Sequence, residues 1–182
     1  MFGWFKSTKN RDQAHELYSA LLGQARLPVF YTDYGVPDTV DGRFDMIVLH
    51  AHILFSRLKD GGADQEQLSQ TVFDLMFADL DQNLREMGVG DIGVGKRIKA
   101  MAEAFYGRAT AYADALKQAD DGDLIAALRR NLYRKSSPTE AQAAAAAHYV
   151  RTQVAQFSAQ DLNDLQKGFI SFYAPKSLAA TS

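Results

Sequence analysis

Residues 29–58 read VFYTDYGVPDTVDGRFDMIVLHAHILFSRL and join an aromatic loop to the most apolar stretch of the chain. Within residues 40–58, apolar side chains recur at steps of three and four, which is the spacing of one helix face. Three further apolar residues extend this face around the helix: Met46, Leu49 and Ile53. Because a helix that is apolar nearly all round must be covered by other elements, we expect residues 40–58 to form the centre of the core.

The loop before this helix carries residue types that recur where one protein binds another. Tyrosine offers a large amphipathic contact area, proline stiffens a turn, and arginine presents a planar fork of donors. On this basis the sequence predicts partner-binding residues at Tyr31, Tyr34, Pro37, Asp38 and Arg43. The alternative is a loop folded onto its own protein, with Arg43 bonded to a carbonyl or an acid.

Apolar periodicity and stop signals predict six further helices. They cover residues 10–25, 64–87, 91–118, 123–132, 138–156 and 158–174. No run of residues alternates in the way a half-buried strand does. The expected fold is therefore all-α, an irregular single-domain bundle of six to seven helices over residues 10–175. The ends, residues 1–9 and 176–182, are expected to be flexible.

The sequence also predicts how individual helices begin. Asp38 or Thr39 is expected to accept hydrogen bonds from the first turn of the central helix. Ser137 is expected to cap the helix whose first residue is Pro138, with Glu140 completing a capping box.

A second segment, residues 85–108, reads REMGVGDIGVGKRIKAMAEAFYGR. Residues 88–93 match the G-x-G-x-x-G pattern of dinucleotide-binding loops, but a polar-faced helix precedes them instead of a buried strand. They are therefore expected to form a joint between two helices. Basic residues interleaved with aromatic ones follow, which suits contact with RNA or an anionic lipid surface. The candidate partner-binding residues in this segment are Lys96, Arg97, Phe105, Tyr106 and Arg108.

Residues 30–50, FYTDYGVPDTVDGRFDMIVLH, and residues 85–108 together resemble the two signature blocks of the ubiquinol-cytochrome c chaperone family. The resemblance covers residues 10–175. One departure is Gly95, where the family commonly carries a proline, and it affects only the local turn. The resemblance implies a non-enzymatic assembly chaperone for the cytochrome bc1 complex, with cytochrome b or a related membrane subunit as its client. It also implies a small partner protein and a place near the ribosome.

Composition limits the other classes of function. A chain of 182 residues with a formal net charge of −2 fits one domain and has no general attraction to nucleic acid, so specific DNA binding is not expected. The sequence has no cysteine, which excludes disulfides and thiolate metal sites. It also lacks a G-x-S-x-G turn, so we expect no enzyme activity, no metal and no cofactor. No run approaches the ~20 apolar residues of a membrane-spanning helix, so the chain is not expected to span a membrane. The family resemblance implies a cytoplasmic protein or one peripheral at the inner membrane, on the matrix side in a mitochondrion.

Two alternative functions remain open in the sequence. A small-molecule or haem-binding bundle would use a buried ligand group such as His50. His50 and His52 lie two residues apart, on different sides of a helix, so they cannot chelate one ion and are expected at the core edge and the surface.

A ribosome- or RNA-binding module is the second alternative. It would combine the basic residues of 85–108 with a second basic cluster. That cluster consists of Arg129, Arg130, Arg134 and Lys135.

Aromatic and basic residues within 1–9 also suit weak contact with an anionic membrane.

Overall fold

The computed structural model describes the backbone of residues 2–178 and the side chains of residues 10–178. The helices are α1 (Phe2–Ala25), α2 (Pro28–Thr32), α3 (Val40–Leu58), the short 3-10 helix η1 (Lys59–Gly61), α4 (Ala63–Glu86), α5 (Asp91–Leu116), α6 (Gly122–Asn131), α7 (Glu140–Ala159) and α8 (Leu162–Gln166). Residues 2–178 contain no strand, and the predicted all-α class is confirmed.

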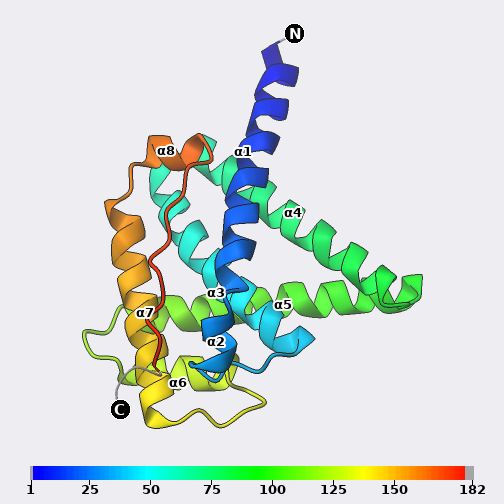
Figure 1. The fold of residues 1–182 in the computed structure, drawn as a ribbon. Coiled ribbons are helices and arrows are strands. Elements are labelled where there is room, and N and C mark those ends of the chain that lie inside the picture. Colours follow the sequence, from blue (N-terminus) through cyan, green and yellow to red (C-terminus); the bar gives the residue numbers. More distant parts are fainter. Residues whose placement is uncertain (1, 179–182) are drawn as a thin grey trace.

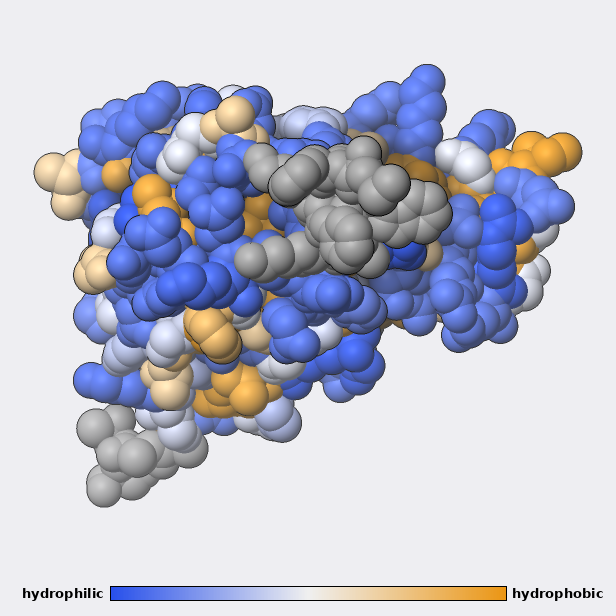
Figure 2. Space-filling view, turned by 90° about the horizontal axis from the view of Figure 1, so that it is seen from above, coloured by the Kyte–Doolittle hydropathy of each residue, from blue (hydrophilic) through white to orange (hydrophobic). Residues whose placement is uncertain are grey.

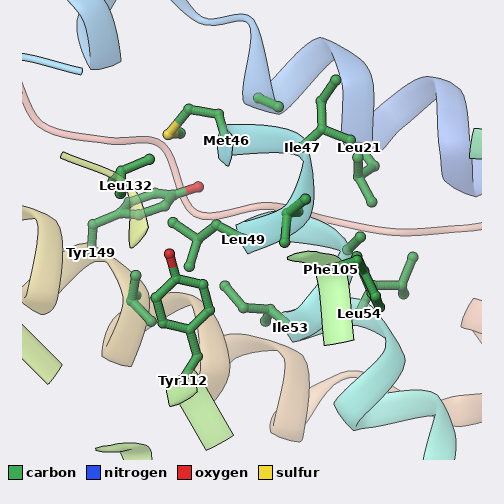
Figure 3. Close-up of a cluster of buried hydrophobic side chains, with 14 of the residues drawn as sticks. Leu21, Met46, Ile47, Leu49, Ile53, Leu54, Phe105, Tyr112, Leu132 and Tyr149 are labelled. Carbon is green, nitrogen blue, oxygen red and sulfur yellow. The ribbon is translucent and has the colours of Figure 1, made fainter. Parts of the chain in front are cut away.

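Helix α3 lies at the centre of the molecule, and α1, α4, α5 and α7 pack around it (Figure 1). Its buried side chains pack against several of these helices, as the cluster around Ile47, Leu49 and Leu54 shows (Figure 3). Thr39 caps α3, and its hydroxyl accepts a 3.1 Å hydrogen bond from the Gly42 amide. Gly42 packs so closely on the preceding loop that a Cβ atom would lie 2.0 Å from the Pro37 carbonyl oxygen. The predicted position and central burial of this helix are confirmed.

Helices α4 and α5 form a long hairpin whose joined ends project away from the bundle (Figure 1). Gly88 ends α4 with a left-handed φ of 82°, and its amide donates to the Arg85 carbonyl at 2.9 Å. Residues 88–93 therefore form a helix-to-helix joint, as the sequence predicts. Apolar surface is exposed at the far end of the hairpin (Figure 2), where Met87 and Ile92 are both exposed.

The end of the chain differs from the prediction. Helix α8 ends at Gln166, not at residue 174, because Gly168 adopts a left-handed φ of 89°. Residues 169–178 then run in an extended path beside α7 (Figure 1). The Leu178 amide donates to a carboxylate oxygen of Asp33 at 3.0 Å. The expected flexibility of residues 176–182 stays a prediction, and residues 179–182 lie outside the described part of the chain.

Three helix starts also differ from the prediction. Helix α1 begins at Phe2, eight residues before the expected start at Asn10. The short helix α2 occupies part of the segment expected to be a loop, with Pro28 as its first residue. Helix α7 is capped by Thr139, not Ser137, because Thr139 and Gln142 form a reciprocal capping box two residues further on.

Candidate binding groove

The described residues enclose a surface groove of about 600 Å³ where the start of α3 meets the hairpin and the loop between α6 and α7. Its lining residues are Thr39, Val40, Asp41, Phe44, Leu84, Met87, Arg97, Ala100, Met101, Ala104, Arg108, Arg134 and Lys135. We call this surface the α3–α5 groove. It brings together the two sequence segments, residues 30–50 and 85–108, that lie far apart in the chain.

Apolar side chains cover much of the α3–α5 groove. Phe44 and Leu84 are buried at its base, whereas Val40 and Met87 are each 58% exposed at its edge. Exposed apolar area of this kind, bordered by polar groups, is typical of surfaces that bind another molecule. The groove therefore offers apolar contact to a binding partner.

A network of charges closes one end of the groove. Asp45 is buried, with one carboxylate oxygen 3.0 Å from Nη2 of Arg108 and the other 3.0 Å from Nε of Arg134. Arg134 also reaches Asp41 at 3.4 Å, and Lys135 pairs with the same carboxylate. Burial raises the pKa of the Asp45 carboxyl, and the nearby Arg108 opposes that rise. The hydrogen bond from Lys135 lowers the pKa of Asp41.

The residues predicted as binding groups in the first segment do not line the α3–α5 groove. Tyr34 is only 4% exposed and packs in the core, so its expected exposure is wrong. Its ring lies edge-on to that of Phe30, with the centroids 5.6 Å apart. Tyr31 is half-buried and its hydroxyl donates to the Ala25 carbonyl at 2.8 Å. This part of the loop is folded onto its own protein, which is the alternative interpretation that the sequence left open.

Arg43 and Asp38 are exposed and form an ion pair with Nε and Oδ1 2.7 Å apart. With Tyr31 they line a separate depression of about 220 Å³. Pro37 is half-buried beside Gly42. The structure thus separates these residues from the groove, and their predicted role in partner binding stays a prediction.

The second segment divides among three environments. Arg97 and Arg108 line the groove on one face of α5, with Arg97 four residues before Met101 and Arg108 four residues after Ala104. Lys96 is exposed outside the groove lining, and Tyr106 is 59% exposed. The ring of Phe105 is buried, so it is a core residue and not an exposed contact; its centroid lies 5.3 Å from that of Phe73.

Sequence reasoning missed the apolar part of the groove. Val40 and Phe44 belong to the stretch that the sequence predicts as core, and Met101 belongs to the predicted helix of residues 91–118. The available signal was the spacing Arg97, Met101, Ala104 and Arg108, in which charged residues flank apolar ones on one helix face. Such a face is exposed at its ends only when neighbouring helices diverge, which the sequence does not reveal.

The second basic cluster is largely neutralised by acids within the same chain. Arg129 pairs with Glu140 at 2.7 Å, and Arg134 and Lys135 pair with carboxylates of α3. An RNA-binding surface needs cations free to pair with phosphates. The pairing therefore weakens the RNA-binding alternative.

His50 has a structural role that accounts for both of its ring nitrogens. Nδ1 donates to the Met46 carbonyl at 2.8 Å, because a carbonyl can only accept, and Nε2 then accepts from the Tyr149 hydroxyl at 2.7 Å. Gln24 donates to the same hydroxyl at 2.9 Å. Any haem bound through His50 would have to displace one of these bonds. Within the described residues, no group of three His, Cys, Asp or Glu side chains lies close enough to hold a metal ion.

His52 is buried too, so its expected place at the surface is wrong. Its ring is 6% exposed and its centroid lies 5.9 Å from that of Tyr112. Burial lowers the pKa of His50 to about 4 and that of His52 to about 4. Unfolding exposes both imidazoles to water, where their pKa returns to about 6.5.

The free energy of unfolding is expected to fall in acid because of these two histidines. Below pH 6.5 the two histidines bind protons in the unfolded chain, but in the folded chain they bind them only near pH 4. The stability that they contribute at neutral pH is therefore lost as the pH falls from 6.5 to 4. One such histidine accounts for about 2 kcal/mol between pH 7.5 and pH 5. Denaturant titrations of the parent and of His52→Phe at both pH values should show a smaller drop in the variant. Equal drops would contradict this role for His52, and both proteins should behave alike between pH 7.5 and pH 8.5.

The fold and the groove together define an all-helical protein whose surface carries an apolar groove bordered by cationic side chains. Residues 32–172 match the family described as ubiquinol-cytochrome C chaperone, and the chain belongs to that family.

The chain is also similar to three individual proteins. It is 34% identical to the protein in the crystal structure of the Cbp3 homolog from Brucella abortus, with a TM-score of 0.83 over 93% of each chain. It is 26% identical, over 88% of this chain and 80% of the relative, to ubiquinol-cytochrome-c reductase complex assembly factor 1 of Xenopus laevis. The human protein of that name is 24% identical over 88% of this chain, which spans 54% of the human protein.

Proposed function

We propose that this chain is a non-enzymatic assembly factor of the cytochrome bc1 complex, which holds a newly made membrane subunit, cytochrome b or a related one, in the α3–α5 groove. The single observation that carries the proposal is that the two family-like segments meet at this groove. The names of the frog and human relatives, assembly factors of the ubiquinol-cytochrome c reductase complex, support the choice of complex. The B. abortus likeness, at 34% identity, supports a shared scaffold.

The groove suits a client that has not yet reached its partners. A membrane subunit exposes apolar helix surface until other subunits or lipid cover it, and such surface drives aggregation in water. Phe44 and Leu84 offer buried apolar contact, and Val40 and Met87 extend that contact at the edge. Covering the client by contact requires no bond to be made or broken, which is why we propose a binding role and not catalysis.

The place of action follows from the client. We propose that the chain works beside the inner membrane, on the cytoplasmic side in a bacterium and the matrix side in a mitochondrion. Within the described residues, no helix is long and apolar enough to cross a membrane. The side chains of residues 1–9, which the sequence suggests for membrane contact, lie outside the described part of the chain. A small partner protein and the ribosome remain further proposed partners.

The combined variant Val40→Asp and Met87→Lys tests the groove. Each change places a charge on an edge residue that is 58% exposed. Each also suits its helix, because Asp stands at the start of α3 and Lys at the end of α4, where the helix dipole favours those charges. The variant should melt within a few degrees of the parent. In a host that carries it as the sole copy, we expect loss of cytochrome b crosslinking and a marked fall in assembled bc1 complex on native gels.

Ile92→Asp is the matched control. Ile92 is 88% exposed in the first turn of α5 and lies outside the groove lining, so the change resembles Val40→Asp in chemistry and helix position. It should leave bc1 assembly at the parental level. Normal assembly with the groove variant, or an equal defect in the control, would show that the groove does not hold the client.

A further inference from the structure

One polar group at the base of the α3–α5 groove is unusual. Arg108 is 8% exposed, lines the groove, and has its guanidinium carbon 5.4 Å from the centroid of the Phe44 ring. Nη2 lies 3.0 Å from Oδ1 of Asp45 in an ion pair, and neither that Oδ1 nor Nη1 of Arg108 has a hydrogen-bond partner within the described residues. Buried donors are nearly always paired, because an unpaired one loses its hydrogen bonds to water without replacement. A charged group makes that loss larger.

The charges around the groove are also unbalanced. Arg97, Arg108, Arg134 and Lys135 line it, and the carboxylates among or behind them are those of Asp41 and Asp45. Four cations against two carboxylates leave an excess of two positive charges. Asp45 is already shared between Arg108 and Arg134. The groove therefore favours an occupant that brings negative charge to its base.

We propose that the α3–α5 groove takes a helix of the bound polypeptide that is apolar along one face and carries an Asp or Glu side chain, whose carboxylate accepts a hydrogen bond from Nη1 of Arg108. This inference rests on the proposed function and names the chemistry of the client segment. A charge-assisted bond in a largely buried setting is stronger than one between neutral groups and fixes the register of the bound helix. Arg97, exposed on the same face of α5, adds a second positive charge further out.

A helix fits the groove better than an extended peptide. Ala100 and Ala104 are short side chains one turn apart on α5, which lets a second helix approach to the usual interaxial distance of about 8–10 Å. An extended peptide would leave its backbone groups unpaired here, because the groove is built from helices and presents no strand edge.

A lipid fits the polarity of the groove poorly. A bound lipid keeps its charged headgroup near water and buries its chains, whereas in this groove the cation of Arg108 is itself buried, beside the ring of Phe44. An acyl chain inserted into the groove would lie against the guanidinium of Arg108. The observations therefore favour a polypeptide over an anionic lipid.

Two synthetic helical peptides test the proposal on the full chain. Both carry the same leucine and alanine face and a fluorescent label, and they differ only in one central residue beside that face, Glu or Gln. Fluorescence anisotropy should show the Glu peptide binding about tenfold or more tightly than the Gln peptide. Arg108→Lys keeps the positive charge but loses the planar fork of donors, and it should lower affinity for the Glu peptide while leaving the Gln peptide unchanged.

The outcomes separate this inference from the proposed function. Equal binding of the two peptides to the parent protein would overturn the carboxylate contact, even if Arg108→Lys fails to fold. Binding of neither peptide, with phosphatidylglycerol vesicles bound instead and released by Val40→Asp and Met87→Lys, would overturn it and assign the groove to lipid. If that groove variant still blocks bc1 assembly while the peptides bind equally, the inference fails and the proposed function stands.

Discussion

Replacing Ile47 with Asp is expected to leave the protein unfolded in neutral buffer. Ile47 is 5% exposed on α3, and its side chain points toward α1 near Leu21 (Figure 3). The substitution removes buried apolar contact and places a carboxylate among apolar groups, which costs several kcal/mol or forces the acid to take up a proton. Because the free energy of unfolding of a small domain is only about 5–15 kcal/mol, this substitution removes a large part of it.

Far-UV circular dichroism and denaturant titration provide the measurement. The parent should show a strongly helical spectrum and a cooperative transition, and Ile47→Asp should show neither. Val40→Asp is the control on the same helix, since it introduces the same acid at a position that is 58% exposed. A cooperatively folded Ile47→Asp protein would mean that α3 is not the centre of the core.

Replacing Tyr34 with Ala is expected to reduce the free energy of unfolding by about 3–5 kcal/mol, the usual loss for an aromatic core residue. The Tyr34 ring lies within 5.6 Å of the Phe30 ring and 6.4 Å of the Tyr149 ring, measured between centroids. Its backbone carbonyl also accepts a 2.8 Å hydrogen bond from the Tyr133 hydroxyl. Truncation would open a cavity between α2, α7 and the loop after α6.

Arg43→Ala provides the comparison within the same segment of sequence. Arg43 is exposed and forms an ion pair with the exposed Asp38, and such surface pairs contribute little to stability. Urea titrations should therefore show no measurable change for Arg43→Ala beside a large one for Tyr34→Ala. If Tyr34→Ala were as stable as the parent, the packed position of the loop would be wrong.

This contrast bears on how function is tested. A variant that removes both Tyr34 and Arg43 would be destabilised by the loss of the Tyr34 ring, so a fall in bc1 assembly would not by itself identify a client contact. The edge residues of the α3–α5 groove avoid that confusion because they are exposed and sit at helix ends that tolerate the new charges. Substitutions at Val40 and Met87 therefore test client binding more directly.

Local sequence was a reliable guide where one strong signal acted alone. The apolar pattern of residues 40–58 predicted α3, and the glycine at position 88 predicted the end of α4. The prediction was wrong where two local signals competed. Two overlapping capping boxes were available, Ser137 with Glu140 and Thr139 with Gln142, and α7 begins with the second. The helix expected after residue 158 stops at Gln166 because Gly168 can take the left-handed conformation at little cost.

By itself, the sequence determined that the protein is all-helical, that residues 40–58 form the central helix of the core, and that residues 30–50 and 85–108 carry its family resemblance. Only the tertiary structure decided that these two segments meet at a groove, that Arg108 lies at its base, and that Tyr34 belongs to the core. The physical reason is that side-chain periodicity specifies which face of each helix is apolar, whereas the crossing of helices and the path of the loops decide which part of that face remains uncovered.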